Sequence, residues 1–181
     1  MASRTMLRAA ATGTTILAAA ALSSCSSALP VGPFGEPRSP GTECIPLRGA
    51  KVITDGWEGV RNHSTTTAVI DRVALTHPKG LRVIRAYVVP AQGEWFGFQR
   101  GYPPGQYRLI GWQWDRRQDA NGARVPPSTG KNDYWNLLLV IEPVAARGTA
   151  AGIDIWYHVG SSNYHLRIET ALVVPTKRRR C

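Results

Sequence analysis

The sequence predicts an all-β fold. Two runs rich in β-branched residues, 66–75 and 81–89, are separated by a short stretch that contains Pro78 and Gly80. Further strand-like segments follow at 109–114, 134–142, 152–159 and 164–174, with turn residues between them. Such runs, bounded by Gly, Pro and Asn, are typical of strands. No window of about a dozen residues shows the 3.6-residue apolar period of a helix.

The individual strands are predicted from their boundaries. Residues 51–60, with Gly56 and Gly59, indicate a first strand and turn. The runs 66–75 and 81–89 are expected to form a hairpin-like pair that Pro90 ends. Trp112 and Trp114 alternate onto one face of the strand 109–114 and are expected in the core, as are Tyr134 and Trp135 beside the leucines at 137–139.

The last two strands allow a prediction of register. With residues 160–163 (GSSN) as the turn, symmetric pairing sets apolar residues opposite one another: Tyr157 and Leu166, Ile155 and Ile168, Ile153 and Thr170. That face should be core, since a slip of one residue would bury the charged face instead. On the other face, Trp156 is expected opposite Arg167, and His158 opposite His165.

Six or seven strands joined by turns suggest a two-sheet sandwich. Residues 62–64 (NHS) before an alternating strand, the Gly80-Leu81 turn, Pro90 and the late Tyr-rich hairpin resemble small immunoglobulin-like domains of exported bacterial lipoproteins. The resemblance implies an immunoglobulin-like two-sheet β-sandwich and no particular chemistry, because such domains share no activity.

The N-terminus has the pattern of an export signal. Arg4 and Arg8 precede an uncharged stretch, 9–22, which is too short to span a bilayer. Leu22-Ser23-Ser24-Cys25 resembles the lipobox of bacterial lipoproteins, which implies removal of residues 1–24 and acylation of Cys25. Two or three acyl chains would hold the protein on the extracytoplasmic face of the cell membrane. The alternative is an ordinary secretory signal cut near Ala20 or Ser24, which leaves Cys25 unmodified.

The mature chain is expected to hold one domain. Residues 25–43 indicate a lipidated flexible tether, 44–176 the β-sandwich, and 177–181 a basic C-terminal tail. Pro, Gly and Ser are so dense at 26–42 that neither helix nor strand is expected there. Such a tether would let the domain stand several tens of ångströms off the bilayer.

Charge and cysteine content agree with export. Loss of the leader leaves 20 basic and 12 acidic residues, a net charge of +8, with a basic run at Lys177–Arg180. Export excludes nucleic acid as a partner, so the run is expected either to meet anionic lipid or wall polymer or to be a solvated tail. Cys44 and Cys181 form an even pair that predicts a disulfide in an oxidising compartment. The alternative is two free thiols.

Two groups of residues are candidates for binding. The segment 94–107 carries five aromatic side chains among glycines and prolines: Trp95, Phe96, Phe98, Tyr102 and Tyr107. A loop of this composition either binds a ligand or partner or closes an open end of the sandwich. His158 and His165, directly opposite in the expected register, could share copper, nickel or zinc, or form an exposed pair with no ligand.

Catalytic motifs are missing from the sequence. It contains no Gly-x-Ser-x-Gly elbow and no His-Glu-x-x-His, and residues 128–131 (STGK) lack the spacing of a phosphate loop. The sequence therefore predicts a non-catalytic, lipid-anchored binding module without a cofactor, whose partner is an envelope protein or a wall glycan. The alternative is a copper- or zinc-binding envelope protein that uses the histidine pair.

Overall fold

The computed structural model describes residues 29–35, 41–104, 112–130 and 132–175. These residues form thirteen strands: β1 (Phe34–Gly35), β2 (Gly41–Cys44), β3 (Ile53–Asn62), β4 (Ala68–Thr76), β5 (Leu81–Pro90), β6 (Gly97–Arg100), β7 (Gln118–Asp119), β8 (Arg124–Val125), β9 (Trp135–Pro143), β10 (Arg147–Ala150), β11 (Gly152–Val159), β12 (Ser162–Ile168) and β13 (Thr170–Pro175). Residues 112–115 form one helical turn.

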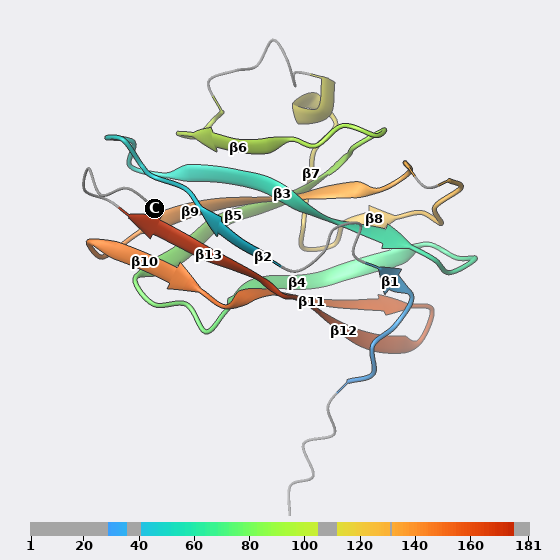
Figure 1. The fold of residues 1–181 in the computed structure, drawn as a ribbon. Helices are drawn as coiled ribbons and strands as arrows, with labels where there is room; N and C mark the ends of the chain where they lie inside the picture. Colours follow the sequence, from blue (N-terminus) through green and yellow to red (C-terminus); the bar gives the residue numbers. More distant parts are fainter. Residues whose placement is uncertain (1–28, 36–40, 105–111, 131, 176–181) are drawn as a thin grey trace, which may run out of the picture.

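The strands form a sandwich (Figure 1). The large sheet has the order β1-β3-β9-β5-β7, with β6 also paired to β3. The facing sheet has the order β12-β11-β4-β8, and a small third sheet has the order β10-β13-β2. The pair β13–β2 is parallel and the other strand pairs are antiparallel. The prediction of an all-β sandwich is confirmed.

Strand β9 explains how the core is divided. Residues 136–141 are buried without interruption, as expected of a strand that is covered on both faces. Leu137, Leu139 and Ile141 point into the main core between the sheets, whereas Leu138 and Val140 join a second cluster. The second cluster contains Phe96 and Trp114, so the chain after β5 folds over the outer face of the large sheet.

Glycine permits the close approach of this cover. A Cβ atom on Gly56 of β3 would lie 2.5 Å from a methyl carbon of Leu138 and 2.8 Å from the Cβ of Phe96. Real side chains do not tolerate such contacts, so a larger residue at position 56 would push the cover away. The strand expected at 51–60 is present as β3, but Gly56 and Gly59 lie within the strand and not in a turn.

The predicted hairpin of 66–75 and 81–89 was wrong in its pairing. Both strands exist as β4 and β5, but β4 lies in the sheet with β11, and β5 lies in the sheet with β9. The turn between them carries the chain from one sheet to the other. The predicted strand 164–174 likewise divides at Glu169 into β12 and β13, which belong to different sheets.

The predicted register of the last hairpin was wrong by two residues. Val159 pairs with Ser162, so the connection has two residues, Gly160 and Ser161, in place of four. Gly160 has a φ of 58°, and a positive φ at the first of two loop residues is what a type II′ hairpin turn requires. A shift of two residues keeps the same face inside, and Ile155 now lies opposite Leu166 in the core.

The predicted strand 109–114 was also wrong where it can be described. Residues 112–115 are helical, and residues 109–111 lie outside the described residues. Trp114 is buried in the second cluster, as expected, but Trp112 is only partly buried. The alternation of the two tryptophans indicated a strand, whereas the helical turn lets Trp114 cover β5 and leaves Trp112 near the surface.

The expectation that residues 26–42 form no strand was wrong for residues 34–35 and 41–42. Phe34 is 3% exposed, belongs to the main core and pairs in β1 with Asn62 of β3. β2 begins at Gly41 and runs parallel to β13. A buried aromatic ring outweighs the weak strand propensity of its Gly and Pro neighbours. The folded domain therefore begins well before residue 44.

Candidate functional site

The candidate site lies where β5 ends and β9 begins. Pro90 at the end of β5 pairs with Trp135 at the start of β9, so the chain leaving one strand and the chain entering the other are neighbours. Two loops therefore meet at this end of the large sheet: residues 91–94, and residues 129–133, of which the structure describes 129, 130, 132 and 133. Loops supported by a rigid scaffold are the usual place for binding residues.

Buried amides hold the first loop. The Gln113 side-chain NH₂ donates to the carbonyls of Ala91, at 3.4 Å, and Glu94, at 3.1 Å. The Asn136 side-chain NH₂ also donates to the Glu94 carbonyl, at 3.4 Å. Both amide side chains are fully buried, and the turn closes on itself through an N–H of Glu94 that donates to Ala91. The loop is thus clamped before any ligand arrives.

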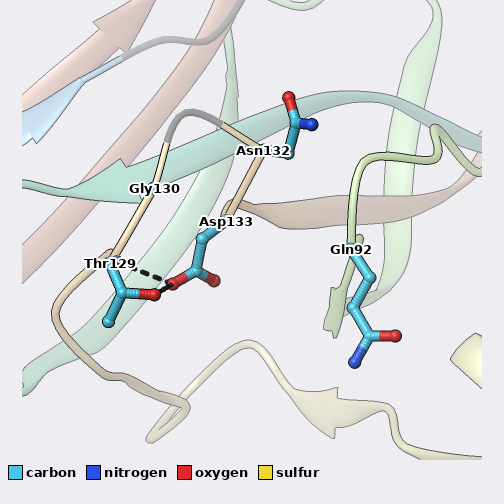
Figure 2. Close-up of a pocket in the computed structure, with 5 residues that line it drawn as sticks. All are labelled: Gln92, Thr129, Gly130, Asn132 and Asp133. Atoms are coloured by element: carbon cyan, nitrogen blue, oxygen red, sulfur yellow. Dashed lines mark hydrogen bonds between the residues drawn. The ribbon is translucent and has the colours of Figure 1, made fainter.

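The second loop is held by a carboxylate. Asp133 Oδ2 accepts the backbone N–H of Thr129 at 2.8 Å and its hydroxyl at 3.1 Å (Figure 2). The Asp133 N–H donates to the carbonyl of Gly130 at 3.1 Å. These bonds connect Asp133 with Thr129 and Gly130, and Asn132 is exposed.

Residues of the two loops line a shallow, open hollow of about 420 Å³. Figure 2 shows Gln92 on one side and the turn with Asp133 on the other. The lining residues offer amide, hydroxyl and carboxylate groups: Gln92, Thr129, Gly130, Asn132 and Asp133. Such groups form hydrogen bonds in both directions, which suits ligands rich in hydroxyl groups.

An aromatic pair follows the two loops in the sequence. Trp95 follows the first loop and Tyr134 follows the second, and their ring centroids are 4.5 Å apart. The N–H of Ala91 donates to the carbonyl of Tyr134 at 3.0 Å, which ties the two loops together. Trp95 is partly buried, and Tyr134 is buried, which raises its pKa.

The aromatic segment 94–107 is mostly a cover. Phe96 is in the second core cluster, Phe98 packs against the main core from β6, and Tyr102 is 38% exposed. Residues 97–100 form a strand, although no strand was predicted there. Tyr107 lies outside the described residues. Of the four described candidates, Trp95 is the one next to the hollow in sequence.

Tyr102 lies over a second aromatic group. Its hydroxyl is 2.6 Å from that of Tyr87, and Trp114 meets both rings edge to face. Burial, together with the bond to Tyr102, raises the pKa of Tyr87. The guanidinium of Arg117 lies 4.3 Å from the Trp114 ring. These contacts hold the cover against β5. Of the three rings, Tyr87 and Trp114 are buried and Tyr102 is partly exposed.

The two histidines are not directly opposite. His165 pairs with Trp156, and His158 pairs with Asn163, so the two histidines are diagonal neighbours. Each has a carboxylate of its own: His158 Nδ1 is 2.8 Å from Asp71, and His165 Nε2 is 2.8 Å from Asp154. Within the described residues, no group of three or more His, Cys, Asp or Glu side chains is placed to hold a metal.

Asp154 is the centre of a charged cluster on the outer face of the hairpin β11–β12. Its Oδ1 accepts bonds from Arg167 Nε and His165, each at 2.8 Å, and its Oδ2 accepts the Thr76 hydroxyl at 2.7 Å. Burial raises the pKa of Asp154, but the bonds from Arg167, Thr76 and His165 outweigh it and leave the pKa below its usual value. The same ion pair raises the pKa of Arg167.

Trp156 lies between side chains from the two neighbouring strands. The guanidinium carbon of Arg72 on β4 is 3.6 Å from the indole centroid, and the His165 ring on β12 stacks at 4.9 Å. A ring occupied from both neighbours offers little flat area to a ligand. Next to it, a hollow of about 250 Å³ has opposed charges in its lining, including Asp71, Arg72, Arg85 and Asp119.

Two of the three cysteines lie outside the described residues, namely Cys25 and Cys181. Cys44 ends β2, pairs with Val173 of β13 and is disulfide-bonded, so its partner also lies outside them. β13 ends at Pro175, close to Cys181 in sequence. The pairing of Cys44 with Cys181 stays a prediction.

Sequence reasoning missed the residues that build the hollow. Gln113 is a polar residue next to Trp114, and Asn136 is a polar residue beside the apolar run 137–141. A polar residue in such surroundings is the one signal that could have singled them out. Thr129 and Asp133 lie in a segment with no periodicity.

No protein-family model matches the chain, and no curated protein matches it. None of the described residues form a helix long and apolar enough to cross a membrane.

Proposed function

We propose that the protein is a lipid-anchored, non-catalytic binding module on the extracytoplasmic face of the cell membrane, and that it holds a glycan in the hollow between loops 91–94 and 129–133. The anchor is the acylated Cys25, and the sequence pattern around it supports this location. The proposal for the ligand rests on one observation: the two loops that line the hollow with amide, hydroxyl and carboxylate groups are each followed in sequence by one ring of the Trp95–Tyr134 pair.

The chemistry of the hollow favours a glycan over a protein partner. Sugar hydroxyls both donate and accept, as do the Gln92 and Asn132 amides, while the Thr129 hydroxyl donates to Asp133 and can still accept. The flat, apolar face of a sugar ring suits an aromatic side chain such as Trp95. A protein partner would instead require a broader contact surface than this hollow provides.

Preorganisation strengthens the proposal. Loop 91–94 is held by Gln113 and Asn136, and loop 129–133 by Asp133. A site whose loops are already fixed loses less conformational entropy when it binds. Gln113 and Asn136 are fully buried, whereas Asp133 is half-buried and lines the hollow itself.

Calorimetric titration with soluble glycan fragments, released from the bacterial wall by a muramidase, tests the proposal. Asn132→Ala and Trp95→Ala are expected to weaken binding about tenfold each, which corresponds to about 1.4 kcal/mol. Gln92→Asn shortens the amide arm and suits the positive φ of 50° at this position, so it tests the hollow without straining the loop.

Trp156→Ala is the matched control, because Trp156 lies on the other sheet and between its own partners. It should leave the affinity for glycan unchanged. Binding that is lost equally in Trp156→Ala, or unchanged in all three hollow variants, would contradict the proposal. Capture of an envelope protein that depends on Trp95 and Asn132 would replace the glycan by a protein ligand.

A further inference from the structure

The hollow lies at the end of the sandwich where the N-terminal segment enters. Phe34 pairs with Asn62, and the Asn62 carbonyl accepts the N–H of Ser128 at 2.8 Å. Ser128 directly precedes Thr129 of the hollow. Adjacent paired chains are about 4.8 Å apart, so only two such spacings separate β1 from this loop. Figure 1 shows β1 at the end of the body away from the end of β13.

The proposed anchor is close to this end along the chain. Leu29 is four residues after Cys25, and four extended residues span at most about 14 Å. From Pro30 the chain is attached to the body, because the Pro30 carbonyl accepts the N–H of His165 and the Pro33 carbonyl accepts that of His63. A tether of several tens of ångströms is therefore not available to the domain.

Two exposed apolar side chains lie on the same short segment. Leu29 is 41% exposed and Val31 is 78% exposed. Apolar side chains next to a lipid anchor gain free energy when they enter the interface between head groups and acyl chains. The short connection and the exposed side chains of Leu29 and Val31 both favour an orientation in which this end of the sandwich faces the bilayer.

We infer that the hollow takes the glycosylated head group of a lipid in the same membrane. This inference rests on the proposed function and narrows it from a glycan to a membrane-borne one. An anchored site meets the head groups around it at a high effective concentration, so modest affinity is enough for high occupancy. Polymer farther out in the wall would face the opposite end of the sandwich, where β9 and β10 are joined.

The orientation can be measured with two labelled variants of the lipidated protein. Ser161→Cys places a fluorophore in the turn between β11 and β12, near the N-terminal segment. Val144→Cys places it at the far end, on a side chain that is 62% exposed and one strand length, about 30 Å, away. Vesicles of phosphatidylglycerol and phosphatidylethanolamine with a head-group nitroxide lipid should quench the Ser161→Cys label at least threefold more. Equal or reversed quenching would overturn the inference.

The ligand class is tested without the anchor. The mature chain with Cys25→Ser keeps every described residue. Its binding to vesicles therefore reports only the hollow and the apolar side chains of Leu29 and Val31. Adding glucosyl, galactosyl and mannosyl diacylglycerols to the vesicles should tighten binding at least fivefold. Asn132→Ala should remove this gain, whereas Leu29→Ser with Val31→Ser should weaken binding to all vesicles.

The outcomes separate this inference from the proposed function. Soluble wall fragments that bind through Asn132, together with glycolipid vesicles that bind no better than plain ones, would overturn the inference and leave the glycan site in place. Failure of both the soluble fragments and the glycolipids would overturn the two proposals together. A gain from glycolipid that survives Asn132→Ala would place the head group outside the hollow.

Discussion

Phe34 stacks on Tyr157 with 3.9 Å between ring centroids and 9° between ring planes, and its N–H donates to the Tyr157 hydroxyl at 2.9 Å. Tyr157 is almost wholly buried, and this burial raises the pKa of its hydroxyl, so the acceptor stays neutral. Tyr164 also stacks on Tyr157, with 5.4 Å between the two ring centroids. The N-terminal segment is therefore part of the core.

Phe34→Ala should lower the free energy of unfolding by about 3–5 kcal/mol, because a large buried ring is replaced by a cavity. Urea denaturation measures the change. Val31→Ala is the control and should change stability by no more than about 0.5 kcal/mol, since Val31 is mostly exposed. If Phe34→Ala were as mild as Val31→Ala, residues 29–35 would be a tether after all.

The main strands were predictable because each has a one-sided or continuous apolar pattern, as in β4, β9 and β11. Phe34 was not, because a single apolar residue among Gly and Pro has no period. The sheet to which β4 and β5 belong was not predictable either, since a short turn suits both a hairpin and a crossing between sheets. The hollow depends on Gln113 and Asp133, whose roles come from contacts between distant segments.

Gln113→Ala should reduce stability by about 1–3 kcal/mol, because the carbonyls of Ala91 and Glu94 lose a buried donor. It should also weaken binding to the glycan, since loop 91–94 loses its clamp. Hydrogen exchange of the Glu94 amide, which donates to Ala91, should become faster. Unchanged exchange at Glu94 alongside a full loss of stability would show that Gln113 supports the core and not the loop.

The lowered pKa of Asp154 predicts a dependence of stability on pH. Because the pKa is lower in the folded state than its ordinary value of 3.8, the stabilisation is present above that value and is lost as the pH falls through the folded pKa. Asp154→Asn should therefore be less stable than the native chain at pH 7, by about 1–3 kcal/mol, and the difference should shrink in strong acid. A difference that stays constant with pH would contradict the assignment.

Double-mutant cycles on the β11–β12 hairpin test the observed register. Trp156 and His165 should show a coupling of about 0.5–1 kcal/mol, because they are paired and stacked. His158 and His165 should show almost no coupling.

Zinc and copper titrations address the alternative function directly. Micromolar binding that is lost in His165→Ala would favour a metal site over the arrangement in which each histidine bonds to its own carboxylate.

The predicted disulfide between Cys44 and Cys181 should stabilise the domain by constraining nearly the whole unfolded chain. The chain-entropy model gives about 5 kcal/mol for a loop of this size. Reduction should therefore lower the melting temperature by several degrees. Peptide mapping without reduction should recover a crosslinked peptide with both cysteines. A crosslink from Cys44 to Cys25 would remove the thiol that the anchor needs.

Mass spectrometry of the N-terminal peptide from protein isolated from the membrane tests the anchored location most directly. The account predicts a chain that begins at Cys25 and carries a diacylglyceryl group on the sulfur, with or without an acyl group on the nitrogen. An unmodified Cys25, whether in an intact leader or after cleavage elsewhere, would contradict it.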